Sequence, residues 1–476
     1  MIRVGMMLIL SVFSSVHSLE VANIPISGVG VLADLFPSLE SLTVENLHLH
    51  VGQGKAILEA LKNSNENIIK PIQEPRNLFD PSLFEPLFKL KKLKALHVVS
   101  IQAPFFSFPF QNLESLNLNV FQSQSKYDLS SRSGVSPLLK EELAKCVNLV
   151  SLQLSFCIDF SRLVNLKSLT VSILEPSDIE KIEKIPSRAL ERLSLAFYNE
   201  EAYNMSDHAK RFPNLNGFAD SLIELIVSKN PPIPRNCLSE LRLKTVRIWK
   251  GHADLVTAIS DSSLSIESLL LYFASQSREI RLGDFDLIAK MVNLTSFCFY
   301  GQIPFGALSV ILHNCQHLIQ FELDQFGAEV VLSDEEVAVI ITFLNKETLT
   351  QLTLNSTRVN SNAMEAIASF PKLESLSVSV DCGQTVSDSW LCPLSKLEGL
   401  HTFDLHVHSF LDVDEPNRSF VNREFITLNG FHKAFGNSKK LDFLSVTEAT
   451  QDIDAADVLK FLPPKAMAYI DNFRSS

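Results

Sequence analysis

The sequence is short of the residues that mark several protein classes. Its 476 residues include only 16 glycines and 21 prolines, too few for a collagen-like or linker-rich chain. Basic residues are also scarce, since 42 Lys and Arg stand against 54 Asp and Glu, which gives a net charge of −12. Phosphate contacts need clustered positive charge, so we expect the chain to bind neither nucleic acid nor an anionic membrane surface.

Cysteines are few, and their number is odd. No two of the seven form a CxxC pair. A disulfide scaffold would be denser and a zinc site would show paired ligands, so neither is expected. We expect most of these cysteines to be small buried apolar residues. Cys298 is the expected exception, because it falls at a solvent-facing strand position of its repeat. The seven are Cys146, Cys157, Cys237, Cys298, Cys315, Cys382 and Cys392.

The motifs of common catalytic sites are missing as well. The sequence has no Gly-rich phosphate loop, no G-x-S-x-G, no H-E-x-x-H and no dinucleotide fingerprint. The acidic segment 412–415 lacks the glycine turn and the remaining ligands of an EF-hand loop, and we interpret it as a solvated loop. We therefore expect no enzyme activity and no cofactor.

Long apolar runs are absent, because none reaches the roughly 20 residues that a bilayer span requires. Residues 4–13 form a shorter apolar run that follows Arg3 and precedes small or branched residues. This pattern is typical of a secretory signal peptide, here over residues 1–18, and predicts a secretory or extracellular location. The alternative is that the run caps the fold, with a first strand starting near Val16, and that the protein is cytoplasmic.

What the sequence does contain is an internal repeat. Residues 36–42 (FPSLESL), 112–116 (NLESL) and 370–376 (FPKLESL) are nearly the same, and they share the template L-x-x-L-x-L-x-x. A partial copy at Val16 brings the total to about sixteen units, and the fifteen clear starts give fourteen spacings with a mean near 29 residues. The clear copies start at Leu39, Leu93, Leu113, Leu149, Leu166, Leu190, Leu222, Leu243, Ile266, Leu294, Leu318, Leu349, Leu373, Leu400 and Leu441.

Each unit combines a strand pattern with a helix pattern. Apolar and polar residues alternate in L-x-L, which is the period of a half-buried strand. Helical periodicity follows at 54–61, 334–344 and 361–368. Such a unit buries its apolar face only by stacking on its neighbours, which aligns the strands in one parallel sheet. We predict one α/β solenoid over residues 19–449, closed by a helical cap over 450–476.

This repeat resembles that of the leucine-rich repeat proteins, and its spacing is most similar to the long-repeat type of ribonuclease inhibitors and F-box proteins. It departs from that type in its irregular unit lengths, and the F-box itself is absent. The resemblance implies a curved horseshoe with a parallel sheet on the concave face and helices or irregular segments on the convex side. It implies a non-enzymatic scaffold that binds a protein partner on the concave face. The alternatives are a ubiquitin-ligase substrate adaptor and a metal-dependent enzyme on the same solenoid.

Aligning the units identifies the solvent-facing strand positions, most of which are small and polar. Three consecutive units instead place Trp249, Tyr272 and Tyr300 at one such position. Aromatic residues beside an arginine and ringed by charge are typical of an interface hot spot, so we predict a partner-binding patch here. The alternative is a register slip of one residue, which would turn the rings into the core. The predicted patch consists of Trp249, Tyr272, Tyr300, Leu270, Arg247, Lys250, Glu322 and Asp324.

One further unit, residues 400–408, carries three histidines and one aspartate. In the aligned register Asp404 and His406 face outward two residues apart, and both are suitable zinc ligands. The neighbouring units offer only Ser and Thr at the facing positions. We therefore expect a solvated polar strand here and no metal.

Overall fold

The computed structural model describes residues 17–25, 36, 38–48, 92–101, 112–120, 137–173, 176–186, 189–197, 212–228, 237–238, 240–249, 258–259, 264–273, 282–325, 332–355, 358–381, 386–408 and 425–472. Residue contacts divide the chain into two compact units, 1–223 and 224–476, and each is described by itself. The predicted signal peptide and the expected helix at 54–61 lie outside the described residues, apart from the last two positions of the former.

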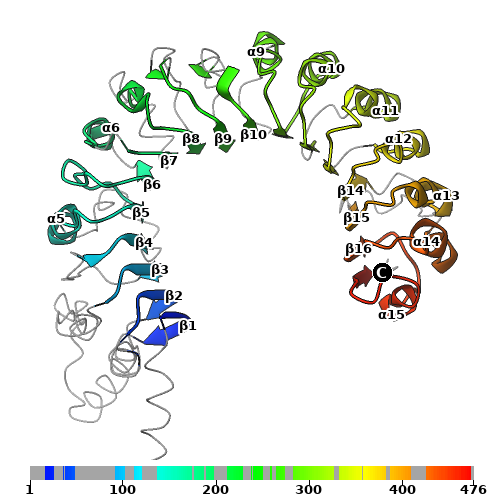
Figure 1. Ribbon diagram of the computed structural model, residues 1–476, viewed down its shortest axis with the longest axis horizontal. Coiled ribbons are helices and arrows are strands. Elements are labelled where there is room, and N and C mark those ends of the chain that lie inside the picture. The colour runs from blue at the N-terminus through cyan, green and yellow to red at the C-terminus, as the bar shows by residue number, and fades with distance from the viewer. Residues whose placement is uncertain are drawn as a thin grey trace, which may run out of the picture. The chain divides into compact units, whose positions relative to one another are not determined.

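The first unit contains a parallel sheet whose strands follow one another in chain order (Figure 1). Its strands are β1 (Ser18–Pro25), β2 (Ser41–His48), β3 (Ala95–Ile101), β4 (Ser115–Val120), β5 (Ser151–Leu154), β6 (Ser168–Ile173) and β7 (Arg192–Phe197). Its helices are α5 (Pro137–Ala144), α6 (Pro176–Glu183) and the 3-10 turn η4 (Asn216–Phe218).

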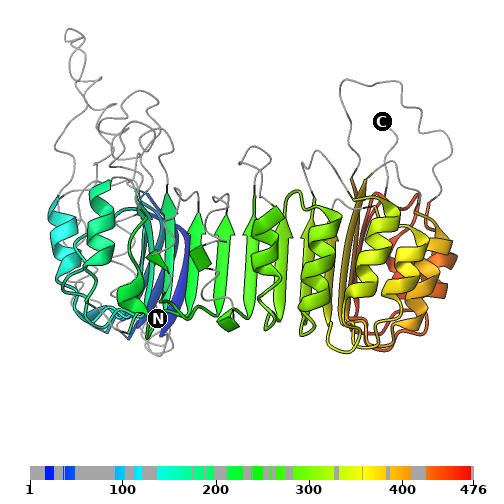
Figure 2. The ribbon, with the colours of Figure 1, turned by 90° about the horizontal axis from the view of Figure 1, so that it is seen from above.

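The second unit repeats this plan with more regular helices, which lie on one side of the parallel strands (Figures 1 and 2). Its strands are β8 (Glu224–Ser228), β9 (Thr245–Trp249), β10 (Ser268–Tyr272), β11 (Ser296–Tyr300), β12 (Gln320–Asp324), β13 (Gln351–Asn355), β14 (Ser375–Asp381), β15 (Thr402–His408), β16 (Phe443–Thr447) and β17 (Met467–Asp471). Its helices are α9 (Leu282–Ile288), α10 (Phe305–Asn314), α11 (Asp334–Phe343), α12 (Ser361–Ile367), α13 (Asp388–Leu391), the 3-10 helix η7 (Cys392–Lys396), α14 (Leu428–Phe435) and α15 (Ala455–Leu459). Of the described helices, none has the length and apolar character that crossing a bilayer requires.

The clear copies of the repeat template correspond to strands β2 to β16. Each of the fifteen clear template starts leads directly into a strand, from Leu39 before β2 to Leu441 before β16. The template leucines are buried, and the strand burial alternates as the period-2 pattern predicts, as in β12. Burying one leucine side chain fully stabilises the fold by about 1.5–3 kcal/mol. The core consists of the apolar face of the sheet and the helices that cover it.

Helix starts depend on local capping. Ser333 accepts a hydrogen bond through its Oγ from the backbone N–H of Glu336, at 3.2 Å, and its own N–H donates to Glu336 Oε2 at 2.8 Å. This capping box satisfies two backbone donors that the first helical turn would otherwise leave unpaired, and it fixes the start of α11. The predicted helices at 334–344 and 361–368 are confirmed as α11 and α12.

The C-terminal segment departs from the expected helical cap. Residues 450–476 contain the short helix α15, but they also contain strand β17, which pairs in parallel with β16. The template leucine is missing before β17, while Ala468 and Ile470 keep the alternation toward the core face. The segment therefore extends the sheet by one strand, because period-2 alternation alone is enough when a neighbouring strand supplies the hydrogen bonds.

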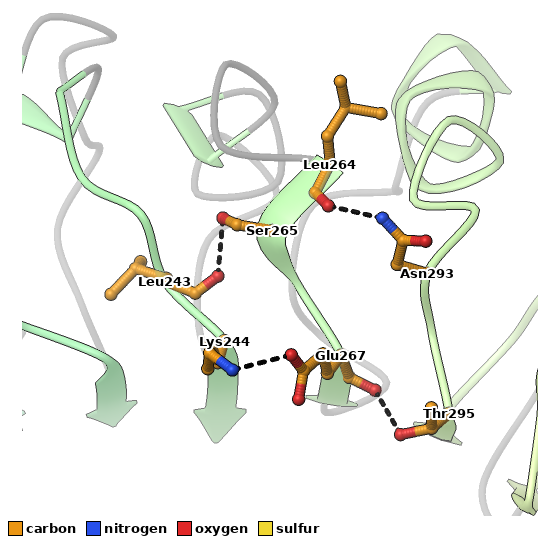
Figure 3. A network of polar contacts seen from close by, with 7 residues as sticks. All are labelled: Leu243, Lys244, Leu264, Ser265, Glu267, Asn293 and Thr295. Carbon is orange, nitrogen blue, oxygen red and sulfur yellow. Dashed lines mark hydrogen bonds and ion pairs between the residues drawn. The ribbon is translucent and has the colours of Figure 1, made fainter.

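Polar contacts between neighbouring repeats join the turns that precede the strands (Figure 3). Asn293 Nδ2 donates to the carbonyl of Leu264 at 2.7 Å, and Ser265 Oγ donates to the carbonyl of Leu243 at 2.8 Å. The carbonyl of Glu267 accepts the backbone N–H and the hydroxyl of Thr295, at 2.8 and 3.0 Å. The side-chain bonds from Ser265 and Asn293 satisfy turn carbonyls, and the Thr295 hydroxyl adds a donor to a carbonyl that already accepts backbone N–H groups. Together they fix each turn against the repeat before it.

Candidate partner-binding site

The register of the sheet brings the predicted aromatic residues into one row. Tyr272 pairs with Trp249 on β9 and with Tyr300 on β11, and Tyr300 pairs in turn with Asp324 on β12. In β9 Val246 and Ile248 are fully buried, and the residues that alternate with them face outward. Trp249 is one of these outward residues. A register slip would have buried the rings, and this alternative is therefore wrong.

The three rings lie against one another, and we call Trp249, Tyr272 and Tyr300 the aromatic cluster. The ring centroids of Trp249 and Tyr272 are 5.7 Å apart, and those of Tyr272 and Tyr300 are also 5.7 Å apart. The outer two rings are 6.3 Å apart, although about 9.6 Å would separate their strands at a spacing near 4.8 Å. The rings therefore lean together, and Trp249 keeps 39% of its surface exposed.

A hydrogen bond fixes one edge of the aromatic cluster. The hydroxyl of Tyr300 donates to Glu322 Oε1 at 2.7 Å. Burial, and after it this hydrogen bond, raises the pKa of Tyr300 well above its ordinary value. The phenol therefore stays protonated and remains a donor, and this hydrogen bond holds its ring in place.

Cys298 differs from its expected exposure. It occupies an outward position on β11 between Leu270 and Glu322, yet only 6% of its surface is exposed. Tyr300 lies two residues further along the same face, and its hydroxyl donates to Glu322, the register partner of Cys298. Burial, and after it the charge of Glu322, raises the pKa of Cys298 to about 12. The thiol is therefore not an activated nucleophile.

The charged residues of the predicted patch lie on both sides of the aromatic cluster. Arg247 on β9 is the register partner of Leu270, and its Nη2 lies 3.9 Å from Glu224 Oε1 on β8. Glu322 and Asp324 both lie on β12, on the opposite side of the rings. Lys250, the remaining residue of the predicted patch, lies outside the described residues.

The candidate metal ligands lie on β15, four strands beyond β11. Asp404 accepts a hydrogen bond of 3.4 Å from Ser377 Oγ, and His406 pairs in register with Ser379. Within the part of the chain that the structure describes, no three metal-binding side chains come together. The two residues thus form at most half of a tetrahedral site.

The first unit contains a separate open hollow at the starts of its strands, with a volume of about 640 Å³. Its charged lining includes Lys94 and Glu114, which form an ion pair at 3.3 Å, and Lys167, which pairs with Glu191 at 3.1 Å. These lysines compensate carboxylates of the adjacent repeat. The hollow therefore lies between stacked repeats whose charged side chains pair with one another.

Comparison with known proteins gives similarity only among solved structures. No protein-family model matches the chain, and no curated protein matches it. The chain is similar to an internalin from Listeria monocytogenes, with 15% identity, a TM-score of 0.37, and coverage of 83% of this chain and 88% of that one. It is also similar to the yeast Rad7 and Elc1 complex, with 16% identity, a TM-score of 0.41, and coverage of 71% and 82%. The repeated template, with one strand per copy in parallel register, gives this chain the α/β solenoid fold of the leucine-rich repeat proteins.

Proposed function

We propose that this protein is a non-enzymatic scaffold that binds a protein partner on the open face of its sheet, the face opposite the helices, with the aromatic cluster as the main contact. The supporting observation is that three large rings from adjacent strands meet on a face whose other positions are mostly small and polar. Large rings at the centre of a patch, with charged residues at its rim, are the usual composition of an interface hot spot.

The titratable groups nearest the rings favour binding over catalysis. Nucleophilic or acid–base work near neutral pH needs a pKa moved toward neutrality. The pKa of Cys298 is raised to about 12 instead, and that of Tyr300 is also raised above its ordinary value. Both groups therefore stay protonated, and the surface offers contact area and hydrogen bonds.

The rings alone are too small for a complete interface. A stable protein–protein contact buries about 800 Å² on each partner. Fully burying one aromatic side chain accounts for roughly 150–250 Å², much of which the rings already cover on one another. Leu270 and Arg247 extend the patch along β10 and β9 in the neighbouring outward row, and Glu322 and Asp324 extend it on β12. We assign these four residues to the rim of the contact.

The test replaces the three rings together. Affinity capture from the native source, with mass spectrometry, identifies proteins retained by the wild type and lost by the Trp249→Ala, Tyr272→Ala, Tyr300→Ala triple variant. The affinity of the identified partner should then fall by about 2 kcal/mol or more, which is about 30-fold in Kd. Circular dichroism should be unchanged, because the rings face outward.

Tyr469 provides a matched control on the same face. It lies on β17 with 56% of its surface exposed, well away from the aromatic cluster in strand order. Tyr469→Ala should leave the affinity for the partner unchanged. An unaltered affinity in the triple variant would place the site elsewhere, and loss of folding would show that the rings belong to the core.

A further inference from the structure

The open face of the second unit is acidic from β10 onward. Strands β10 to β17 contain no Lys or Arg. Among the side chains described there, the outward positions carry the four carboxylates of Glu322, Asp324, Asp404 and Asp471, and His406 has the one titratable nitrogen. Arg247, on β9, has Glu224 beside it. A partner of complementary charge is therefore basic where it meets this face.

The aromatic cluster forms a platform and not a cage. A cage would need two facing rings roughly 7 Å apart or more, twice the contact distance of carbon atoms, to admit a cation between them. Here the ring centroids are 5.7, 5.7 and 6.3 Å apart, and the ring planes are tilted by only 31°, 41° and 32°. At these separations the rings cover part of one another's faces, so a cation can use only the part of the cluster that stays exposed, including Trp249 with 39% of its surface exposed. A planar cation gains more from such a surface than a compact ammonium does.

Two carboxylates border this platform on one side. Glu322 is fixed there by the hydrogen bond that it accepts from the Tyr300 hydroxyl. Asp324 is the register partner of Tyr300, about 4.8 Å away across one strand spacing. A guanidinium stacked on the rings can therefore direct its N–H groups at carboxylate oxygens, and this fork geometry is one that an ammonium cannot reproduce.

We propose that the partner contributes an arginine whose guanidinium stacks on Trp249, Tyr272 and Tyr300 and donates hydrogen bonds to Glu322 and Asp324. This inference rests on the proposed function, since it specifies the chemistry of the residue that binds the same patch. Arginine is preferred over lysine because it combines a flat cation with paired donors and is more weakly hydrated.

The test uses short peptides that differ in one side chain. Glycine-rich peptides carrying arginine, lysine or uncharged citrulline are titrated into the full chain at about 0.15 M salt, which screens the general attraction of a basic peptide to an acidic protein. Trp249 reports binding by fluorescence, because Trp390, the other tryptophan, has only 1% of its surface exposed. Trp249→Phe serves as the blank.

The arginine peptide should bind roughly tenfold tighter than the lysine peptide, and citrulline should not bind. The near-isosteric double variant Glu322→Gln, Asp324→Asn should weaken the arginine peptide by roughly tenfold or more, while Asp404→Asn, on β15, should not. Equal binding of arginine and lysine, or full retention by the double variant, would overturn the proposal.

The two proposals fail differently. If the triple alanine variant loses the captured partner but the double variant keeps it, the scaffold function stands and the arginine is ruled out. If the triple alanine variant keeps the partner, the patch is not the site, and the arginine at this site is ruled out with it.

Discussion

Replacing Tyr300 with alanine should expose the thiol of Cys298 to alkylation. In the wild type the ring of Tyr300 extends toward Glu322, the register partner of Cys298, and only 6% of the cysteine surface is exposed. Burial is the largest cause that raises the pKa of Cys298 from the ordinary 9.0 to about 12. Removing the ring admits water, so the pKa should fall back toward its ordinary value.

The size of the effect follows from the fraction of thiolate. Near pH 8, thiols with pKa values of about 12 and 9 are ionised to fractions on the order of 10⁻⁴ and 10⁻¹, a gain of about a thousandfold on exposure. A thiolate of lower pKa is also a weaker nucleophile, with a Brønsted coefficient of about 0.4–0.5, which offsets roughly 15- to 30-fold of that gain. Alkylation should therefore accelerate about 30- to 60-fold, before any steric gain.

The assay follows iodoacetamide incorporation over time near pH 8 by peptide mass mapping. Cys315 is the internal control, because burial also raises its pKa to about 12 and it lies in the turn after α10, where its Sγ contacts the carbonyl of Met291 at 3.5 Å. Its rate should be the same in both proteins. An unchanged rate at Cys298 would refute the covering role of Tyr300, and a parallel rise at Cys315 would mean that the variant has lost its fold.

Three further predictions concern stability. Trp390→Phe should lower the free energy of unfolding by about 0.5–1.5 kcal/mol in chemical denaturation, because the hydrogen bond of 2.7 Å that Trp390 Nε1 donates to the buried carbonyl of Val359 is lost. Trp249→Phe should change the free energy of unfolding far less. Asn293→Ala should cost about 1 kcal/mol by the same measurement, because its bond to the Leu264 carbonyl is lost, and a value near zero would show that water replaces the amide. Gly301→Ala should cost about 1–3 kcal/mol in thermal denaturation, because φ is 135° and the new Cβ would lie 3.0 Å from the Phe273 carbonyl oxygen. Gly306→Ala, in helix α10 with nothing within 4 Å of the new Cβ, should be neutral or stabilising, and equal losses at both glycines would contradict this reasoning.

The strands could be predicted because their signal is local and repeated. Each template places three apolar residues at fixed offsets, so an error in one unit is corrected by the others. The start of α11 is also local, since Ser333 and Glu336 cap it within one turn. Strand β17 was missed for the same reason: its sequence, MAYID, keeps the alternation but lacks the leucine that starts the template.

The side-chain details of the site depend on geometry that the sequence does not carry. Alignment alone predicted that the three aromatic positions are neighbours, but the closeness of Trp249 to Tyr300 depends on how the rings lean across β10. The hydrogen bond from Tyr300 to Glu322 and the burial of Cys298 likewise depend on side-chain directions that the sequence does not carry. The bond between Asn293 and Leu264 spans 29 residues, so only the stacked units bring those two residues together.

Lysines lie near the starts of the strands, whereas carboxylates lie on the open face from β10 onward, and this distribution affects the rate at which a charged partner associates. Near the starts of the strands, lysines pair with carboxylates of the next repeat, as Lys244 does with Glu267 at 2.9 Å. Such exposed pairs add at most about 1 kcal/mol each, but they neutralise basic charge locally. The strands from β10 to β17 contain no Lys or Arg, so no lysine or arginine of these strands offsets the carboxylates on their open face. A field of one sign over one face steers an oppositely charged partner toward it, and salt screens that field over about 8–10 Å. Association with a basic partner should therefore slow as salt rises, whereas contacts of the aromatic cluster, once made, should respond to salt much less.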